Sequence, residues 1–184
     1  MSKLVVNNEA QNGQMVLMLD NELPTRIYFW NKERQLFDKP LNFNLEVSFL
    51  LEELSEYYRA VTVEEQIDAL CDIMVFAFGF GFKSGMQFKG DFLATGSYLE
   101  RDLVGYVYDM LDGQPLEDCL DKLLKTCMLI IYDLNYDPSV ALNEVVKHIE
   151  SRVGSINEAG KWVKDKTAVT YTPNFELAFI TREN

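Results

Sequence analysis

The sequence is poor in the residues that several common kinds of site require. It has one histidine, His148, and three cysteines without a Cys-x-x-Cys spacing among its 184 residues. A zinc site, a disulfide framework and a Cys/His nucleophile pair are therefore poorly supported. We expect Cys71, Cys119 and Cys127 to be reduced residues of the core in a cytoplasmic protein. His148 has no evident acidic or nucleophilic partner in the sequence, so a structural or exposed position is expected.

Basic charge and long apolar runs are also scarce. Lysine and arginine number 17 against 29 acidic residues, which gives a net charge of −12. A protein that binds a nucleic-acid backbone needs a basic footprint, so this charge argues against a nucleic-acid polymer as partner. The longest near-continuous apolar run, 73–82, is too short to span a bilayer, and the first residues lack the apolar segment of a signal peptide. We therefore expect no membrane partner.

The composition is that of a folded chain. Hydrophobic residues make up 48% of it and aromatic residues 12%, which excludes an intrinsically disordered protein. No proline-rich or glycine-serine linker divides the sequence. We expect one domain over 1–184, with a core at about 26–153 and a basic C-terminal segment at 154–184.

Hydrophobic periodicity and capping residues predict a mostly helical fold. The predicted helices cover 26–37, 41–60, 63–78, 97–111, 115–132 and 137–153. Residues 88–96 and the stretch after Gly154 resemble loops, with a short strand at 167–171. The residues from Thr62 to Glu65 fit a capping box. The fold class is therefore all-α, a helical bundle around an antiparallel hairpin of 41–60 and 63–78.

Acidic residues of this hairpin lie away from its expected solvent faces. On a helical wheel of 41–60, one apolar arc holds Phe43, Val47, Leu50, Leu51, Leu54 and Tyr58. Ser48, Glu52, Ser55 and Arg59 form the polar arc. Glu53 and Glu56 fall on neither arc, but on a third arc with Leu45, Phe49 and Ala60. These two carboxylates therefore face something other than bulk solvent.

The second helix repeats this arrangement. Glu65, Asp68 and Asp72 are spaced i, i+3, i+7 and share one face, which Val75, Phe76 and Gly79 border. Folding the hairpin brings Glu56 level with Asp68, and Glu53 level with Asp72. Like charges so close are destabilising unless cations neutralise them, and Mg²⁺ prefers carboxylate oxygens. The sequence therefore predicts a magnesium site, with Mn²⁺ as an alternative metal.

The same residues resemble a known signature. Segments 52–56 (EELSE) and 65–72 (EQIDALCD) resemble the ExxE…ExxD pattern of the MazG-like all-α nucleoside triphosphate pyrophosphohydrolases. That superfamily includes phosphoribosyl-ATP pyrophosphohydrolases and dimeric dUTPases. Segment 72–79 (DIMVFAFG) is similar to the branch with a further acid, and 37–42 (FDKPLN) resembles the F-x-x-P segment before the first ligand helix.

The resemblance implies Mg²⁺-dependent hydrolysis of a nucleoside triphosphate to its monophosphate and pyrophosphate, for sanitation of the nucleotide pool. It implies that Glu53, Glu56, Asp68 and Asp72 hold the metal and that Glu65 is a further ligand or the general base. It also implies a homodimer or homotetramer. A dUTPase or a phosphoribosyl-ATP hydrolase is the alternative within the class. A catalytically silent helical module that binds nucleotides or a protein is the alternative outside it.

The C-terminal segment supplies candidates for substrate binding. Arg152, Lys161 and Lys164 are candidates for phosphate contacts, with Asn157 as a base or ribose contact, because related proteins carry a basic, Asn-containing segment after their helices. A solvated tail is the equal alternative. Phe37 and Trp30 are candidates for stacking on a base, although aromatic residues at such positions are more often part of the core.

Overall fold

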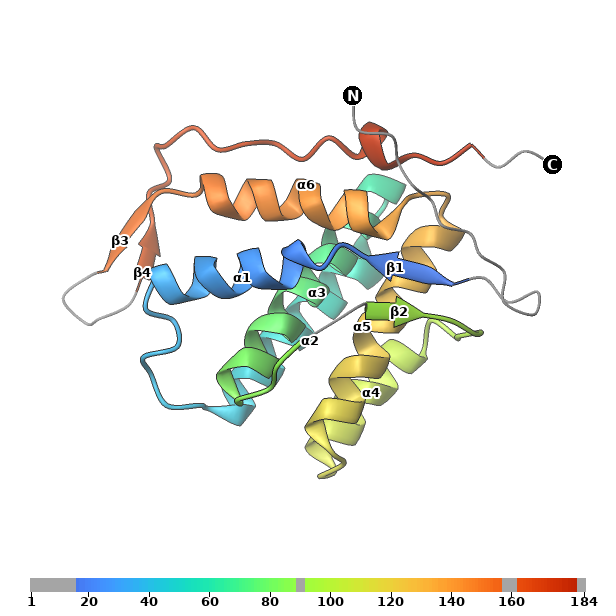
Figure 1. Ribbon diagram of the computed structural model, residues 1–184, viewed down its shortest axis with the longest axis horizontal. Coiled ribbons are helices and arrows are strands. Elements are labelled where there is room, and N and C mark those ends of the chain that lie inside the picture. Colours follow the sequence, from blue (N-terminus) through green and yellow to red (C-terminus); the bar gives the residue numbers. More distant parts are fainter. Residues whose placement is uncertain (1–15, 89–91, 157–161, 182–184) are drawn as a thin grey trace.

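The computed structural model describes residues 16–88, 92–156 and 162–181 (Figure 1). Within these ranges the fold is mostly helical. Its helices are α1 (Glu22–Glu33), α2 (Phe43–Arg59), α3 (Val63–Lys83), α4 (Asp102–Leu111), α5 (Leu116–Asp133) and α6 (Pro138–Ser151), with a short 3-10 helix η1 (Phe175–Ala178). Two antiparallel ribbons accompany them, β1 (Leu17–Leu19) with β2 (Phe92–Ala94), and β3 (Gly154–Ile156) with β4 (Trp162–Lys164).

Helix α3 is the centre of the fold. It packs against α2 along its length and also contacts α1, α5 and α6. Figure 1 shows α1 and α6 side by side across the α2–α3 pair, with α4 and α5 together beyond it. Eleven residues of α3 are buried, from Ile67 to Gly81, because the helix is apolar nearly all round. The paired walls of α2 and α3 therefore rest on a continuous apolar core.

The ends of the hairpin helices are fixed by local hydrogen bonds. The Asn42 side chain accepts a hydrogen bond from Leu45 N at 3.2 Å and begins α2. Thr62 Oγ1 accepts one from Glu65 N, and Glu65 Oε2 accepts from Thr62 N, both at 3.2 Å. This is the predicted capping box, and it confirms the start of α3.

Helix α3 continues past Gly79 to Lys83, so the prediction that it ends at Phe78 was wrong. Its glycines permit close packing inside the helix. A Cβ at Gly81 would lie only 2.5 Å from the Phe88 ring, which covers this turn. Glycine is therefore favoured at position 81 by tertiary contact, and local propensity alone misplaces the helix end.

Other predicted boundaries also change. Helix α1 covers 22–33 instead of 26–37, and α4 starts at 102 instead of 97. The predicted loops at 88–96 and after Gly154 contain β2 and β3, while the strand predicted at 167–171 is absent. Each strand has three residues, and β1 and β2 are distant in sequence, so a local hydrophobic pattern cannot reveal their pairing.

The predicted apolar arc of α2 is partly wrong. Leu51 and Tyr58 are 44% and 50% exposed, whereas Tyr57, which the wheel did not place on that arc, is 5% exposed. Val47, Leu50 and Leu54 are buried as predicted. The buried face of α2 is rotated toward Tyr57 because α3 and α4 contact it from different sides.

The three cysteines are free and buried, which confirms their predicted place in the core. In the described part of the chain, no helix has both the length and the apolar character needed to cross a membrane.

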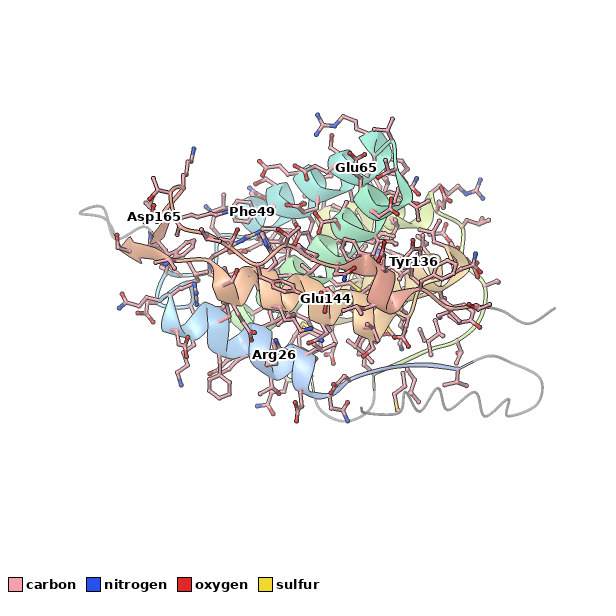
Figure 2. All side chains as sticks on the ribbon, turned by 90° about the horizontal axis from the view of Figure 1, so that it is seen from above. Arg26, Phe49, Glu65, Tyr136, Glu144 and Asp165 are labelled. Carbon is pink, nitrogen blue, oxygen red and sulfur yellow. The ribbon has the colours of Figure 1, made fainter. Side chains whose placement is uncertain are left out.

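The C-terminal segment is fastened along α6, as Figure 1 shows. The Glu144 carboxylate, 1% exposed, accepts hydrogen bonds from Lys147 Nζ, the Tyr171 hydroxyl and Asn174 N. His148 Nδ1 bonds the Tyr171 carbonyl, in keeping with its predicted structural position. Figure 2 shows Glu144 on α6 near the middle of the molecule. The buried Glu144 carboxylate therefore ties the C-terminal segment to α6.

We predict that Glu144→Ala lowers the free energy of unfolding by about 2 to 4 kcal/mol, because it leaves three donors without their charged acceptor. Chemical denaturation measures this loss. Glu33→Ala is the control, since the Glu33 side chain is 74% exposed, and it should change stability by less than about 0.5 kcal/mol. Equal effects of the two variants would contradict the prediction.

Candidate functional site

A cavity of about 500 Å³ lies between the α2–α3 pair and the elements that cross it. Its α2 and α3 wall contains Leu45, Glu46, Phe49, Glu53, Glu56, Asp72, Val75, Phe76, Gly79, Phe80 and Lys83. Its facing wall contains Trp30 and Asn31 of α1, Arg34 at the C-cap of α1, Gln35, Leu36, Phe37 and Lys39 after it, Ile149 and Arg152 at the end of α6, and Trp162 of β4. The third arc of the α2 wheel is the one that lines this cavity.

The hairpin wall is acidic at one helical turn and aromatic at the next. Glu53, Glu56 and Asp72 form an acidic end. One turn farther along the hairpin, the Phe49 and Phe76 rings pack at 5.4 Å between centroids. Because residues four apart lie on the same helix face, each aromatic ring stands next to a carboxylate of its own helix. The cavity therefore joins an acidic end to an aromatic one.

Burial and repulsion from neighbouring carboxylates raise the pKa of two carboxylates at the acidic end. The pKa of Glu53 rises to about 8, chiefly through burial and then through the charges of Asp72 and Glu56. The pKa of Asp72 rises to about 7, again chiefly through burial, with the charge of Asp68 adding and that of Arg152 opposing. These carboxylates are thus close enough to interact and poorly hydrated.

The four predicted metal ligands are grouped, although not all line the cavity. Glu53, Glu56 and Asp72 line it, whereas Asp68 is exposed and outside the lining, although its charge acts on Glu53 and Asp72. Glu65 lies outside the lining, at the start of α3, where its carboxylate accepts bonds from Val61 N and Thr62 N. Figure 2 shows Glu65 and Phe49 at different positions along the hairpin.

Within the described residues, no three histidine, cysteine, aspartate or glutamate side chains are already arranged as a group that could hold a metal ion. One oxygen, Glu53 Oε2, is buried without a hydrogen-bond partner among these residues. A buried, unpaired carboxylate oxygen is costly, and a proton or a cation would relieve that cost.

Two arginines face the cavity from the opposite wall. The Arg34 guanidinium lies 4.5 Å from the Trp30 ring and 5.4 Å from the Trp162 ring, and it donates to the carbonyls of Trp30 and Arg152. The Nε atoms of Arg34 and Arg152 are buried and have no partner among the described residues. Burial lowers the pKa of Arg34, and the exposed Glu33 carboxylate, 3.9 Å away, offsets this only in part. This wall therefore offers donors for an anion.

A buried ion pair lies at the aromatic end of the cavity. Lys83 Nζ and Glu46 Oε1 are 2.6 Å apart, and both side chains are less than 15% exposed. The pair joins the last turn of α3 to the first turn of α2 and also lines the cavity. It therefore links the two helices at this end of the hairpin.

The other predicted substrate contacts are distributed unevenly. Phe37 and Trp30 line the cavity together with Arg152. Lys164 is exposed on β4 and is not part of the lining. Asn157 and Lys161 lie outside the described residues.

Sequence reasoning missed several residues of this cavity, above all Arg34, Lys83, Asn31 and Trp162. Asn31 lies on α1 and Arg34 at its C-cap, and the face that this helix turns to the cavity is set only by its packing on α3 and α6. The tryptophan depends on the β3–β4 pairing, where a Cβ at Gly154 would lie 2.5 Å from the Trp162 ring. The clustering of both tryptophans with arginines in the sequence, at 30–34 and 152–162, was the one available signal.

No family model, curated protein or solved structure matches this chain.

The raised pKa values predict an unusual pH dependence of stability in a chelating buffer. Between pH 4.5 and about 8, folded Glu53 binds more protons than it does in the unfolded chain, where its pKa is ordinary, and Asp72 behaves alike up to about 7. Stability contributed by these groups is therefore lost as the pH rises through this window. We expect Tm to fall between pH 5 and pH 8, and the fall to be smaller in Glu53→Gln.

Glu52→Gln is the matched control, since Glu52 precedes Glu53 but is exposed and outside the cavity. It removes the same charge from the chain and should retain the wild-type slope of Tm against pH. Identical slopes in both variants would show that general charge repulsion, not the buried group, sets the dependence.

Proposed function

We propose that this protein is a Mg²⁺-dependent nucleoside triphosphate pyrophosphohydrolase of the MazG-like all-α type, with Mn²⁺ as an alternative metal. The observation that carries the proposal is the cavity, in which three carboxylates at one end, two of them half-buried, face two guanidinium groups whose buried Nε atoms have no partner among the described residues. A triphosphate with a bound divalent cation carries both charges that these two walls would neutralise.

The acidic end has the donor chemistry of a magnesium site. Glu53, Glu56 and Asp72, together with Asp68, whose charge acts on Asp72, would hold the ion through carboxylate oxygens. Glu53 Oε2, buried and without a partner in the described part of the chain, supports this assignment together with the raised pKa values of Glu53 and Asp72, because a cation offsets the repulsion that helps to raise them. When bound, the metal supplies charge neutralisation and polarises a phosphate oxygen.

The opposite wall would bind the phosphates. Arg34 lies against two indole rings, so its guanidinium group is placed by packing before a ligand arrives, and Arg152 follows the last residue of α6 on the same wall. Planar guanidinium groups suit phosphate oxygens because they donate two parallel hydrogen bonds. These residues would stabilise the negative charge that develops on the leaving pyrophosphate.

The chemistry follows from this division of charge. A water oxygen attacks the α-phosphorus, the bond from that phosphorus to the α–β bridging oxygen breaks, and the products are a monophosphate and pyrophosphate. A carboxylate of the acidic end receives the proton of the water. Glu65 is not assigned this role, because its carboxylate caps α3 outside the cavity.

Pyrophosphate release from a panel of nucleoside triphosphates, with Mg²⁺ and with a chelator, tests the proposal. We expect Mg²⁺-dependent release, and we expect Glu56→Gln and Asp72→Asn to lower kcat at least about 100-fold and to lose the rise in Tm that Mg²⁺ causes. Glu52→Gln should retain both properties. Silence of the wild type across the whole panel would overturn the proposal in favour of a binding module.

The panel includes dUTP and phosphoribosyl-ATP, so that it also separates a dUTPase or a phosphoribosyl-ATP hydrolase from a broader enzyme of the nucleotide pool.

The proposal extends to a homodimer or homotetramer in the cytoplasm. Light scattering of the eluting protein tests the assembly state.

Arg152 and Lys164 allow a sharper test of the phosphate wall. Arg152→Ala should lower kcat/KM at least about 100-fold, because it removes a buried donor that faces the substrate. Lys164→Ala removes a nearby exposed cation and should change kcat/KM less than about threefold. Similar losses in both variants would indicate a diffuse electrostatic attraction instead of a built contact.

A further inference from the structure

The outer face of α4 is apolar and exposed. Helix α4 packs against α5 and α2 through one side, and Figure 1 shows α4 and α5 together beyond the α2–α3 pair. Val104, Tyr108 and Leu111 lie on another side of α4, and each is between 45% and 66% exposed. Their spacing of i, i+4, i+7 places them on one helix face. No α4 residue lines the described cavity, so the proposed hydrolysis does not use this face.

The apolar surface continues onto α2. The Tyr58 hydroxyl donates to the Glu100 carbonyl at 3.1 Å, so Tyr58 lies beside the start of α4. Leu51 lies two turns before Tyr58 on the same face of α2, and both side chains are about half exposed. An exposed apolar surface that extends over parts of two helices is typical of a protein–protein contact.

Gly105 lies on the same face of α4, where the helix itself has no use for a glycine. The residue is exposed, its φ is not positive, and a Cβ at this position would meet nothing within 4 Å. Among all residues except proline, glycine is the least favourable in a helix interior. It does, however, permit the close approach of another chain.

The charges at the two ends of α4 are also placed against local stability. Arg101 is the N-cap and Asp112 is the C-cap, and both are exposed. The helix dipole favours the opposite arrangement, an acid at the start of a helix and a base at its end. Among the described residues, neither side chain forms an ion pair. The two residues are about three helical turns apart, so they lie on the same face as Tyr108.

We propose that this face joins two copies of the chain across a two-fold axis, with α4 of one copy antiparallel to α4 of the other. Arg101 and Asp112 flank α4 by one residue on either side, so each Arg101 lies opposite the partner's Asp112. Gly105 and Tyr108 are equally far from the middle of α4, so each Tyr108 ring lies over the partner's Gly105. One arrangement therefore accounts for the exposed apolar residues, the glycine and both charges.

The charges favour a second copy over a different protein as the partner. A partner must present an acid opposite Arg101 and a base opposite Asp112, and this same face does so when it is turned end for end. An apolar centre between charged ends is also the usual composition of an interface. The interface rests on the homo-oligomer of the proposed function and assigns the surface that forms it.

Sedimentation equilibrium of the full chain over a concentration series tests the interface. We expect the wild type to contain an even number of chains. Tyr108→Glu should raise the dissociation constant between the halves of the assembly at least about 100-fold, because it buries a charge in the apolar centre. Phe29→Glu is the matched control, since Phe29 is an aromatic residue of α1 that is also more than half exposed, and it should leave this constant unchanged.

Exchange of the two charges tests the antiparallel arrangement. Arg101→Asp or Asp112→Arg alone places like charges opposite each other and should raise the dissociation constant at least about tenfold. The double variant R101D/D112R restores both pairs in reverse and should return the constant to within about threefold of the wild type. Both changes suit the helix dipole, so neither destabilises the monomer. Failure of the double variant to restore the assembly overturns the arrangement.

Gly105→Leu is a second variant of the apolar centre. A Cβ at this position has open space in the single copy, and leucine favours the helix, so the variant folds. In the assembly the added side chain occupies the place of the partner's Tyr108. We therefore expect the dissociation constant to rise at least about tenfold.

Two further results overturn the interface. One is a wild type that stays monomeric over the whole series, and the other is an assembly with the same dissociation constant in Tyr108→Glu and Gly105→Leu as in the wild type. Pyrophosphate release measured on the same samples separates the two proposals. A monomer that releases pyrophosphate retains the hydrolase without the interface. An assembly that Tyr108→Glu separates, but that hydrolyses no triphosphate, retains the interface and excludes the hydrolase.

Discussion

The placement of like charges along the α2–α3 hairpin is the constraint on which the rest of the site depends. Glu53 and Asp72 stand on adjoining helices at one end of a cavity, where burial and the charges of neighbouring carboxylates raise both pKa values. Such a group persists only if the surrounding fold supplies the stability that it removes. Helix α3 supplies it, because its remaining faces are buried against four other helices.

The opposite wall does not neutralise this charge by direct pairing. Among the described residues, no ion pair joins Arg34 or Arg152 to Glu53, Glu56 or Asp72. By contrast, Lys83 and Glu46 do form a close pair at the other end of the same cavity. The two arginines are instead held by indole rings and carbonyls, so acid and base remain on separate walls. A ligand that carries both a cation and phosphates suits that separation, whereas a self-paired cluster would bind neither.

The hairpin wall of this site could be predicted from the sequence, because helical periodicity alone decides which residues share a face. Glu53 and Asp72 share faces with Phe49 and Phe76, and all four line the cavity. The facing wall could not be predicted in this way. Arg34 reaches the cavity through the packing of α1 on α3 and α6 and through stacking on Trp162, whose strand pairs with β3. Such contacts join segments far apart in sequence and leave no local pattern.

Periodicity also has a limit within the hairpin itself, which Glu65 illustrates. Glu65 shares a helix face with Asp72. That face extends along the whole of α3, whereas the cavity covers only a part of it. The carboxylate of Glu65 already accepts hydrogen bonds from Val61 N and Thr62 N at the helix start. The capping box that correctly fixes where α3 begins therefore also occupies the carboxylate that spacing alone assigns to the metal. A local hydrogen-bonding role and a role in the cavity compete for one side chain, and here the structure places Glu65 in the local one.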